Sequence, residues 1–270
     1  MKKLQLAFSP CPNDTFMFDA MIHGKIDTEG LEFEVVLEDV ETLNKKALAG
    51  ESEISKLSFY AYTNVTENYQ LLSSGSALGK GVGPLFISKR KFNDPENEIR
   101  SIAIPGKNTT AYFLFRTFFP KLTNVNEIVF SDIESAILDE KVDAGVIIHE
   151  NRFTYETKGL LKIADLGEMW EQKTKLPIPL GGIVIRRDLD ENTKKKVERI
   201  LRKSVEYAFA NPESSGEYVK LHAQEMSPEV RKKHIDLYVN SYSADLGANG
   251  KNAIHEMFRI IGVSDKNIFV

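Results

Sequence analysis

The chain has 270 residues, of which 42% are hydrophobic and 27% charged, enough apolar material for one large domain or two lobes. Its formal net charge of −4 argues against nucleic acid or an anionic membrane as a partner, because both attract basic surfaces. The single cysteine, Cys11, excludes an intramolecular disulfide, and no stretch approaches the ~18 apolar residues that a membrane span requires.

The first 60 residues alternate between predicted strands and helices. A strand is expected at Leu4–Phe8, and because it is too short for the apolar segment of a signal peptide, we expect a cytoplasmic protein. Asn13 or Asp14 is expected to cap a helix that begins at Thr15. The following expected elements are the strand Leu31–Leu37, the helix Val40–Ala49, the strand Ile54–Leu57 and a helical turn from Phe59 to Tyr62. Such alternation is typical of an α/β lobe.

Four glycines fall within the nine residues from Gly75 to Gly83. They precede the apolar run Pro84–Ile87, which predicts a strand. A glycine-rich approach to a strand fits a hinge or a crossover between lobes, and a plain surface loop is the alternative.

A second α/β series follows the polar segment that ends at Arg100. Its expected elements are the strand Ile102–Ile104, the helix Thr109–Phe119, the strand Ile128–Phe130, the helix Ile133–Leu138, a strand that ends at His149, the strand Leu160–Ala164 and the helix Leu166–Lys173. Leu176–Gly182, with two prolines and two glycines, is the strongest predicted break in the chain. The strand Ile183–Ile185 is expected next, followed by the helices Lys196–Ala208, Ser214–Gln224, Pro228–Val239 and Gly250–Ile261.

Two apolar strands flanked by glycine, near Leu85 and Val184, bracket the middle series. This arrangement fits a known type of α/β fold, in which the chain leaves one lobe, builds a second and returns, with a ligand cleft between the two lobes. One lobe would comprise residues 1–88 and 184–270, and the other residues 89–183.

His149 is the histidine that the pattern places at a candidate site. Val146, Ile147 and Ile148 form a β-branched run too short for a helix, which predicts a strand buried on both faces. Ligands of open parallel sheets bind beyond the carboxyl ends of the strands, where His149 would lie. The alternative is a rim histidine that caps its own strand, and Glu150 is expected to be a solvated rim residue.

Two polar segments follow predicted strands and precede predicted helices. At Thr109 and Thr110, hydroxyl groups and the first N–H groups of a helix would form an anion site, although simple capping of the helix is the alternative. Lys56, Leu57 and Ser58 repeat this geometry in the first lobe. Considered alone, Lys56 would more commonly be a surface lysine.

Other chemistries find little support. Cys11 has no neighbour in the sequence that would activate it as a nucleophile. The five histidines lack the spacing of a zinc site, and no GxGxxG or P-loop pattern occurs, so we expect no metal and no cofactor.

The motifs resemble those of the 1,4-dihydroxy-6-naphthoate synthase family, which acts in the futalosine route to menaquinone. The resemblance covers essentially the whole chain and is carried by Ser9–Phe16, Lys56–Ser58, Gly106–Thr110 and Val146–Glu150. It implies a periplasmic-binding-protein type II-like fold and a lyase that converts cyclic dehypoxanthine futalosine, a small carboxylate, into 1,4-dihydroxy-6-naphthoate. It further implies that His149 is catalytic and that Lys56, Leu57, Ser58, Thr109 and Thr110 bind substrate.

Two other functions remain open at this point. The same fold serves non-catalytic solute-binding proteins for small carboxylates, so the architecture alone does not decide for an enzyme. Chorismate dehydratase, a sister enzyme of the same pathway and fold, is disfavoured by the Ser9–Phe16 motif and by His149. Whether Glu150 or Asp14 tunes the imidazole is not determined by the sequence.

Overall fold

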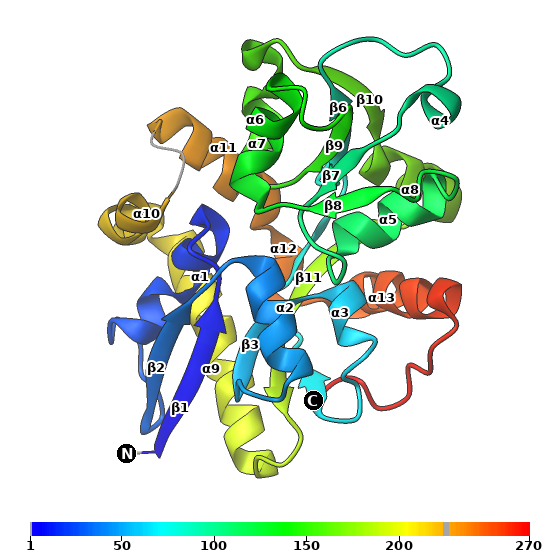
Figure 1. Cartoon of the computed structure of the whole chain (residues 1–270). Helices are drawn as coiled ribbons and strands as arrows, with labels where there is room; N and C mark the ends of the chain where they lie inside the picture. Colours follow the sequence, from blue (N-terminus) through cyan, green and yellow to red (C-terminus); the bar gives the residue numbers. More distant parts are fainter. Residues whose placement is uncertain (1, 224–226) are drawn as a thin grey trace. The chain divides into compact units, whose positions relative to one another are not determined.

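The computed structural model of the protein describes residues 2–223 and 227–270. The chain divides into two compact units (Figure 1). Unit 1 combines the residues up to Gly79 with Pro179–Val270, and unit 2 is the intervening segment Lys80–Ile178. Each unit contains its own mixed sheet.

The sheet of unit 1 has six strands in the order β2-β1-β3-β11-β4, with β5 paired to β11. These strands are β1 (Lys2–Phe8), β2 (Leu31–Leu37), β3 (Ile54–Ser58), β4 (Tyr69–Leu71), β5 (Ala77–Gly79) and β11 (Ile178–Arg186). The first three run parallel, whereas β11 is antiparallel to β3 and β4. Consequently β1, β2 and β3 all end at the same edge of the sheet.

The helices of unit 1 come from both ends of the chain. They are α1 (Pro12–Ile22), α2 (Val40–Leu48), α3 (Phe59–Tyr62), α9 (Glu191–Ala210), α10 (Gly216–His222), α11 (Pro228–Tyr238), α12 (Ser241–Ala244) and α13 (Gly247–Ile261), with a 3₁₀ turn at Pro212–Ser215. Asp39 caps α2 and Asp190 caps α9, each by accepting hydrogen bonds from backbone N–H groups of the first turn.

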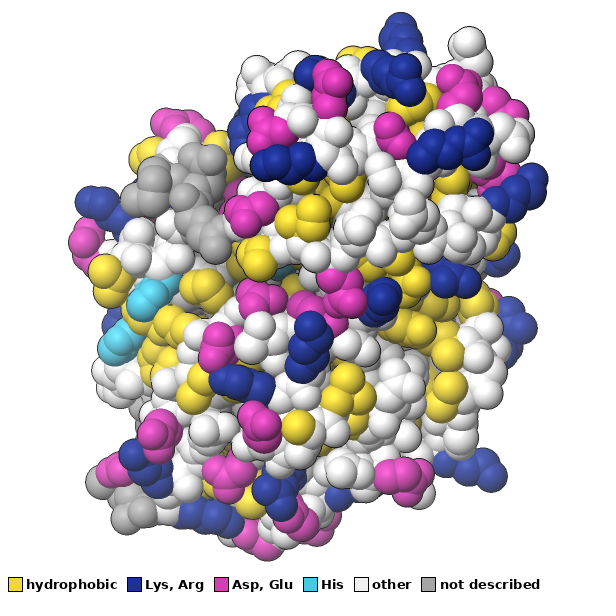
Figure 2. All heavy atoms as spheres, in the orientation of Figure 1, with side chains coloured by type: hydrophobic (Ala, Val, Ile, Leu, Met, Phe, Trp, Pro, Cys, Tyr) yellow, Lys and Arg dark blue, Asp and Glu magenta, His cyan; other side chains and the backbone are white. Residues whose placement is uncertain are grey.

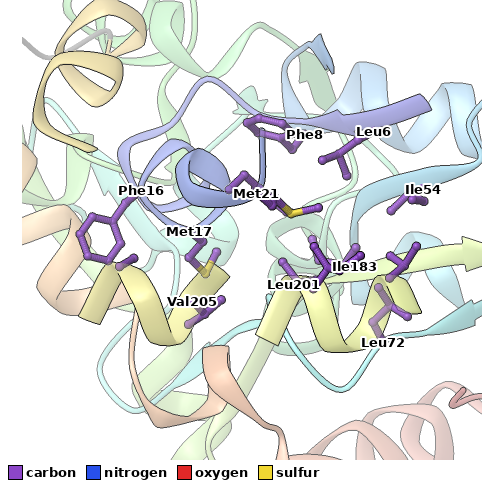
Figure 3. Close-up of a cluster of buried hydrophobic side chains, with 14 of the residues drawn as sticks. Leu6, Phe8, Phe16, Met17, Met21, Ile54, Leu72, Ile183, Leu201 and Val205 are labelled. Atoms are coloured by element: carbon purple, nitrogen blue, oxygen red, sulfur yellow. The ribbon is translucent and has the colours of Figure 1, made fainter. Parts of the chain in front are cut away.

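The core of unit 1 forms between its sheet and helices α1 and α9. In Figure 3, Phe8 of β1 lies near Met21 of α1, Ile183 of β11 lies beside Leu201 of α9, and Met17 of α1 lies beside Val205 of α9. All six side chains are at most 2% exposed. Burial of each such side chain contributes roughly 1.5–3 kcal/mol, so this cluster holds α1 against the sheet and α9.

The sheet of unit 2 has five strands in the order β10-β6-β9-β7-β8. They are β6 (Leu85–Ser88), β7 (Ile102–Ile104), β8 (Val125–Glu127), β9 (Ala144–Ile147) and β10 (Leu161–Asp165). The helices are α4 (Pro95–Glu98), α5 (Thr110–Phe118), α6 (Ile133–Leu138), α7 (Asn151–Thr154) and α8 (Leu166–Thr174), with 3₁₀ turns at Phe130–Asp132 and Tyr155–Lys158. Strand β7 is parallel to both β8 and β9, whereas β6 is antiparallel to β9 and β10.

The borders between the units differ from those expected at residues 88/89 and 183/184. Strand β6 belongs to unit 2, because Leu85–Ser88 pairs with β9 and β10. Residues 179–183 belong to unit 1, because β11 pairs with β3 there. The glycine-rich stretch is no plain surface loop, since residues 75–79, 82 and 83 are buried and include β5.

Two predicted elements are wrong. The break expected at Leu176–Gly182 is largely the first half of β11, which continues through Pro179 and the two glycines. The strand expected at Ile128–Phe130 lies earlier, at Val125–Glu127, and Phe130 instead begins a 3₁₀ turn. The helix predicted for Ser214–Gln224 is α10, preceded by the 3₁₀ turn; Gln224 itself lies outside the described residues.

The surface shows no extended patch of one charge on the face drawn in Figure 2, where lysine and arginine alternate with aspartate and glutamate. This mixture agrees with the small net charge of −4. Of the helices in the described part of the chain, none combines the length and apolar character needed to cross a membrane.

Candidate functional site

In unit 2, the predicted site residues follow two neighbouring parallel strands. Ala103 of β7 lies opposite Gly145 of β9, so the segments after Ile104 and Ile147 emerge at the same edge of the sheet. Thr109 and Thr110 come after the first strand and His149 after the second. Ligands of such sheets bind at this edge, and the pairing therefore brings together the two motifs of unit 2.

Thr109 is the N-cap of α5. Its Oγ1 accepts a hydrogen bond from the backbone N–H of Tyr112 at 3.1 Å and donates one to the carbonyl of Gly106 at 2.7 Å. Thr109 and Thr110 are each only 2% exposed. Because the hydroxyl of Thr109 already donates within the turn, the capping interpretation is correct for Thr109, and an anion here would be bound by N–H groups of the first helical turn.

His149 has a left-handed backbone conformation, with φ of +59°. This conformation costs a residue with a side chain roughly 1–2 kcal/mol, and such strain is concentrated at functional sites. The imidazole is partly exposed and lies edge-on to the ring of Phe130, with 4.9 Å between ring centroids and 63° between the planes. Phe130 thus packs against the ring at the end of a buried strand.

Glu150 is not the solvated rim residue that the sequence suggested, because its side chain is only 7% exposed. The left-handed turn at His149 ends the strand, so that residue 150 no longer follows the strand's alternation of faces and instead precedes α7. A second carboxylate, Glu134 of α6, is 3% exposed and accepts hydrogen bonds from Asn151 at 2.9 Å and Lys158 at 2.7 Å. No short-range sequence pattern indicated Glu134.

Arg152 fixes the segment after His149 to the rest of unit 2. Its guanidinium donates to the carbonyl of Gly83 at 2.5 Å and to the carboxylate of Asp165 at 2.6 Å. Gly83 and Gly167 approach so closely that a Cβ on Gly83 would lie 2.2 Å from the Cα of Gly167. A glycine is therefore required at position 83 by close backbone contact.

In unit 1, the motif after β1 forms a buried polar cluster around Asp14, which is 1% exposed. Its carboxylate accepts hydrogen bonds from Ser9 Oγ at 2.7 Å, Asn13 Nδ2 at 2.8 Å and Lys56 Nζ at 2.8 Å. The expected capping role is wrong: helix α1 starts at Pro12, and Cys11 holds the N-cap position without a side-chain hydrogen bond. Asp14 instead lies in the first turn, where the helix dipole favours a negative charge.

Lys56 and its neighbours are buried too. Lys56 is 6% exposed, which excludes the surface-lysine interpretation, and besides Asp14 it donates to the carbonyl of Gly75 at 3.3 Å. Ser58 is held by the side chain of Asn44, which accepts from the Ser58 N–H at 2.9 Å and donates to the Ser58 Oγ at 3.1 Å. Leu57 is 1% exposed, so its side chain belongs to the core.

One further member of this cluster was not predicted from the sequence. His234 of α11 is fully buried, and its Nε2 lies 2.9 Å from Oδ1 of Asn13. Cys11 is also buried, at 6% exposure. Within the described residues, no group of three or more histidine, cysteine, aspartate or glutamate side chains could hold a metal ion.

Comparison with known proteins shows the family to which the chain belongs. A family model described as menaquinone biosynthesis matches residues 4–262. The chain belongs to this family. It is 45% identical to a 1,4-dihydroxy-6-naphthoate synthase of Thermus thermophilus over 96% of this chain and 93% of that protein. It is 44% identical to a 1,4-dihydroxy-6-naphthoate synthase of Streptomyces coelicolor over 93% of this chain and 90% of that protein.

The fold comparison agrees with the family. A Candida albicans protein described as having the generic periplasmic binding protein fold superposes with a TM-score of 0.70, although only 14% of residues are identical. The match covers 99% of this chain and 94% of that one. The predicted periplasmic-binding-protein-like α/β fold is therefore confirmed, and the predicted membership in the menaquinone biosynthesis family with it.

Proposed function

We propose that the chain is a carbon–carbon lyase that converts cyclic dehypoxanthine futalosine into 1,4-dihydroxy-6-naphthoate. The family and the activity named for relatives 44–45% identical support this proposal. The single structural observation that carries it is His149, an imidazole held in a strained conformation at the edge shared by β7 and β9.

In the proposed mechanism, His149 removes a proton from the substrate. An imidazole is suited to this step because its ordinary pKa is close to neutrality. The edge contact with Phe130 restricts the imidazole's rotation, so less freedom is lost when it meets the acidic C–H. Cleavage of the C–C bond then releases the sugar-derived fragment, which takes up the proton held by His149, and formation of the aromatic ring supplies driving force.

The N-terminus of α5 is the proposed anchor for the substrate carboxylate. Its first-turn N–H groups carry a partial positive charge, and Thr109 fixes their orientation through its cap. Lys56, Leu57 and Ser58 are the proposed substrate contacts in unit 1. Since the side chain of Leu57 is buried, we assign its contact to the backbone.

The test is turnover of cyclic dehypoxanthine futalosine, followed by naphthalene absorbance. His149→Asn tolerates the left-handed conformation but cannot act as a base, so we expect kcat to fall by about 10²–10⁴-fold while the substrate still binds. His255→Asn is the matched control, because His255 is a partly buried histidine of unit 1 that is bonded to Asp265. Full activity of His149→Asn would remove this residue from the mechanism.

The same experiment separates the other candidate functions. A non-catalytic solute-binding protein with this fold would bind the substrate without forming product. A chorismate dehydratase would leave this substrate unchanged and consume chorismate. Either result would overturn the proposed lyase.

A further inference from the structure

A continuous chain of buried side chains joins helix α11 to Lys56, the lysine predicted to bind substrate. His234 Nε2 lies 2.9 Å from Asn13 Oδ1, Asn13 Nδ2 lies 2.8 Å from Asp14, and Asp14 lies 2.8 Å from Lys56 Nζ. All four residues are at most 6% exposed. They come from α11, α1 and β3, and all belong to unit 1.

The chemistry of the groups fixes the direction of each hydrogen bond. The Asp14 carboxylate, next to an ammonium group, acts only as an acceptor, so Asn13 must turn its NH₂ toward Asp14. The amide oxygen of Asn13 then faces His234, whose Nε2 must carry the hydrogen. With any other orientation of Asn13, an oxygen would face the carboxylate. His234 therefore fixes the orientation of Asn13, and Asn13, together with Ser9, holds Asp14.

Lys56 is the end of the chain that the family resemblance assigns to substrate binding. Its ammonium group has three hydrogens, and the described residues accept two, at Asp14 and at the carbonyl of Gly75. The remaining hydrogen can be donated to an oxygen atom of a ligand. Its direction depends on how the other two are held, because the three N–H bonds of an ammonium group have fixed mutual angles.

Stability alone gives little reason for this arrangement. A buried ion pair is commonly no more stabilising than apolar side chains of the same volume, because desolvation offsets the attraction between the charges. A network that is fully hydrogen-bonded does, however, restrict its members to one geometry. Such restriction is what a group that must point at a substrate requires.

We propose that His234 and Asn13 are positioning residues that act through Asp14 to aim the Lys56 ammonium group at an anionic or carbonyl oxygen of the substrate. The proposal rests on the proposed function for the identity of that substrate. The aiming of Lys56 itself is a property of the free protein.

The first test therefore needs no turnover. In protein labelled with ¹⁵N-lysine, the buried Lys56 ammonium signal is assigned by its loss in Lys56→Met. We expect His234→Leu to shift or broaden this signal, and His234→Gln, which restores an N–H near the same place, to return it. His255→Leu is the control, since His255 is hydrogen-bonded to Asp265 and lies outside the chain from His234 to Lys56. An unmoved Lys56 signal in folded His234→Leu would overturn the proposal.

The second test is kinetic. With the substrate above, His234→Leu is expected to raise KM about tenfold and to change kcat little, as for the loss of one hydrogen bond in a charged network. His234→Gln should recover most of the change, whereas a merely structural defect would lower the amount of active enzyme and leave KM unaltered. If His234→Leu does not fold, Asn13→Ser provides the same comparison, since it too breaks the chain between α11 and Asp14.

The two tests separate the two proposals. Absence of turnover in the unaltered protein, together with a Lys56 signal that responds to His234→Leu, would refute the proposed enzyme and retain the positioning. Turnover in the unaltered protein, together with a Lys56 signal that does not respond to His234→Leu, would support the proposed enzyme and refute the positioning.

Discussion

The two predicted halves of the site differ in how their key side chains are held. Around Lys56 in unit 1, buried donors and acceptors meet one another, and a carboxylate balances the cation. Around His149 in unit 2, the backbone is strained and the imidazole is partly exposed. Groups that only position another side chain, such as His234 and Asn13, can be fully enclosed, whereas a group that exchanges a proton must remain accessible to its substrate.

The largest expected effect tests the enclosed half. Asp14→Asn leaves the Lys56 ammonium group buried without its counter-charge, so we expect the free energy of unfolding to fall by about 3–5 kcal/mol. Urea titration measures it. Glu134→Gln is the matched control in unit 2, because its partner Lys158 is 47% exposed in the side chain and can return to water. Equal losses for the two variants would mean that enclosure does not distinguish the halves.

The next prediction separates capping from ligand binding at α5. Thr109→Val removes the hydroxyl that accepts from Tyr112, and we expect a loss of about 1 kcal/mol in stability. Thr110→Val leaves the Thr109 cap in place, and we expect it to raise KM for the carboxylate substrate. Thermal unfolding and KM, measured on both variants, check this. An unchanged KM in Thr110→Val would contradict the assignment.

A smaller effect tests the strain at His149. A protein with alanine at a regular position is normally more stable than one with glycine by about 0.5–1 kcal/mol. At φ of +59° this order should reverse, so we expect the free energy of unfolding of His149→Gly to exceed that of His149→Ala by about the same amount. Comparing two variants cancels the lost contact with Phe130. The same pair at Lys195, an exposed position within α9, should show the normal order. Normal order at both positions would show that His149 is unstrained.

The smallest effect concerns Glu198, a partly buried carboxylate of unit 1 whose hydrogen-bond donors, on Ser73 and Ser74, are neutral. Burial raises the pKa of Glu198, although the hydrogen bond from the Ser73 N–H at 2.7 Å opposes the change. The folded protein therefore binds this proton more tightly than the unfolded chain, and stability falls as the pH rises past the unfolded pKa. We expect Glu198→Gln to be slightly more stable than the unaltered protein at pH 7.5, with the difference closing towards pH 4.5. Urea titrations at the two pH values check this, and the opposite trend would contradict it.

Much of the fold could be predicted from local pattern. Strands such as β1 and β3 and helix α2 lie close to their predicted positions, because apolar spacing and the Asp39 cap act over a few residues. The position of His149 after a buried strand followed from the same reasoning. Its left-handed backbone did not, because nothing in the local sequence requires it.

The errors have physical causes that lie far away in the chain. Pro179 is tolerated in β11 because it lies near the start of the strand, before the pairing with β3 that runs from Gly181 to Ile185. Gly181 is there because a Cβ would lie 2.7 Å from the carbonyl oxygen of Leu57. The prolines and glycines of Leu176–Gly182, which predicted a break, thus allow β11 to pass close to β3.

The cluster around Asp14 shows the same limit. His234 and Asn13 are 221 positions apart, and a single sequence gives no sign that they meet. Lys56 was judged a surface residue when considered alone, since its burial depends on Asp14 and Gly75. Sequence could propose which residues form the site but not the network that holds them.

The insertion of unit 2 between Gly79 and Pro179 has a consequence for biosynthesis. Strand β11 lies between β3 and β4, so the first sheet cannot be completed until the ribosome has translated beyond Arg186. Until then β3 has an open edge, which is prone to pair with other chains. The middle segment is synthesised before that point, and we expect it to acquire structure first on the nascent chain, which shortens the gap that β11 must close.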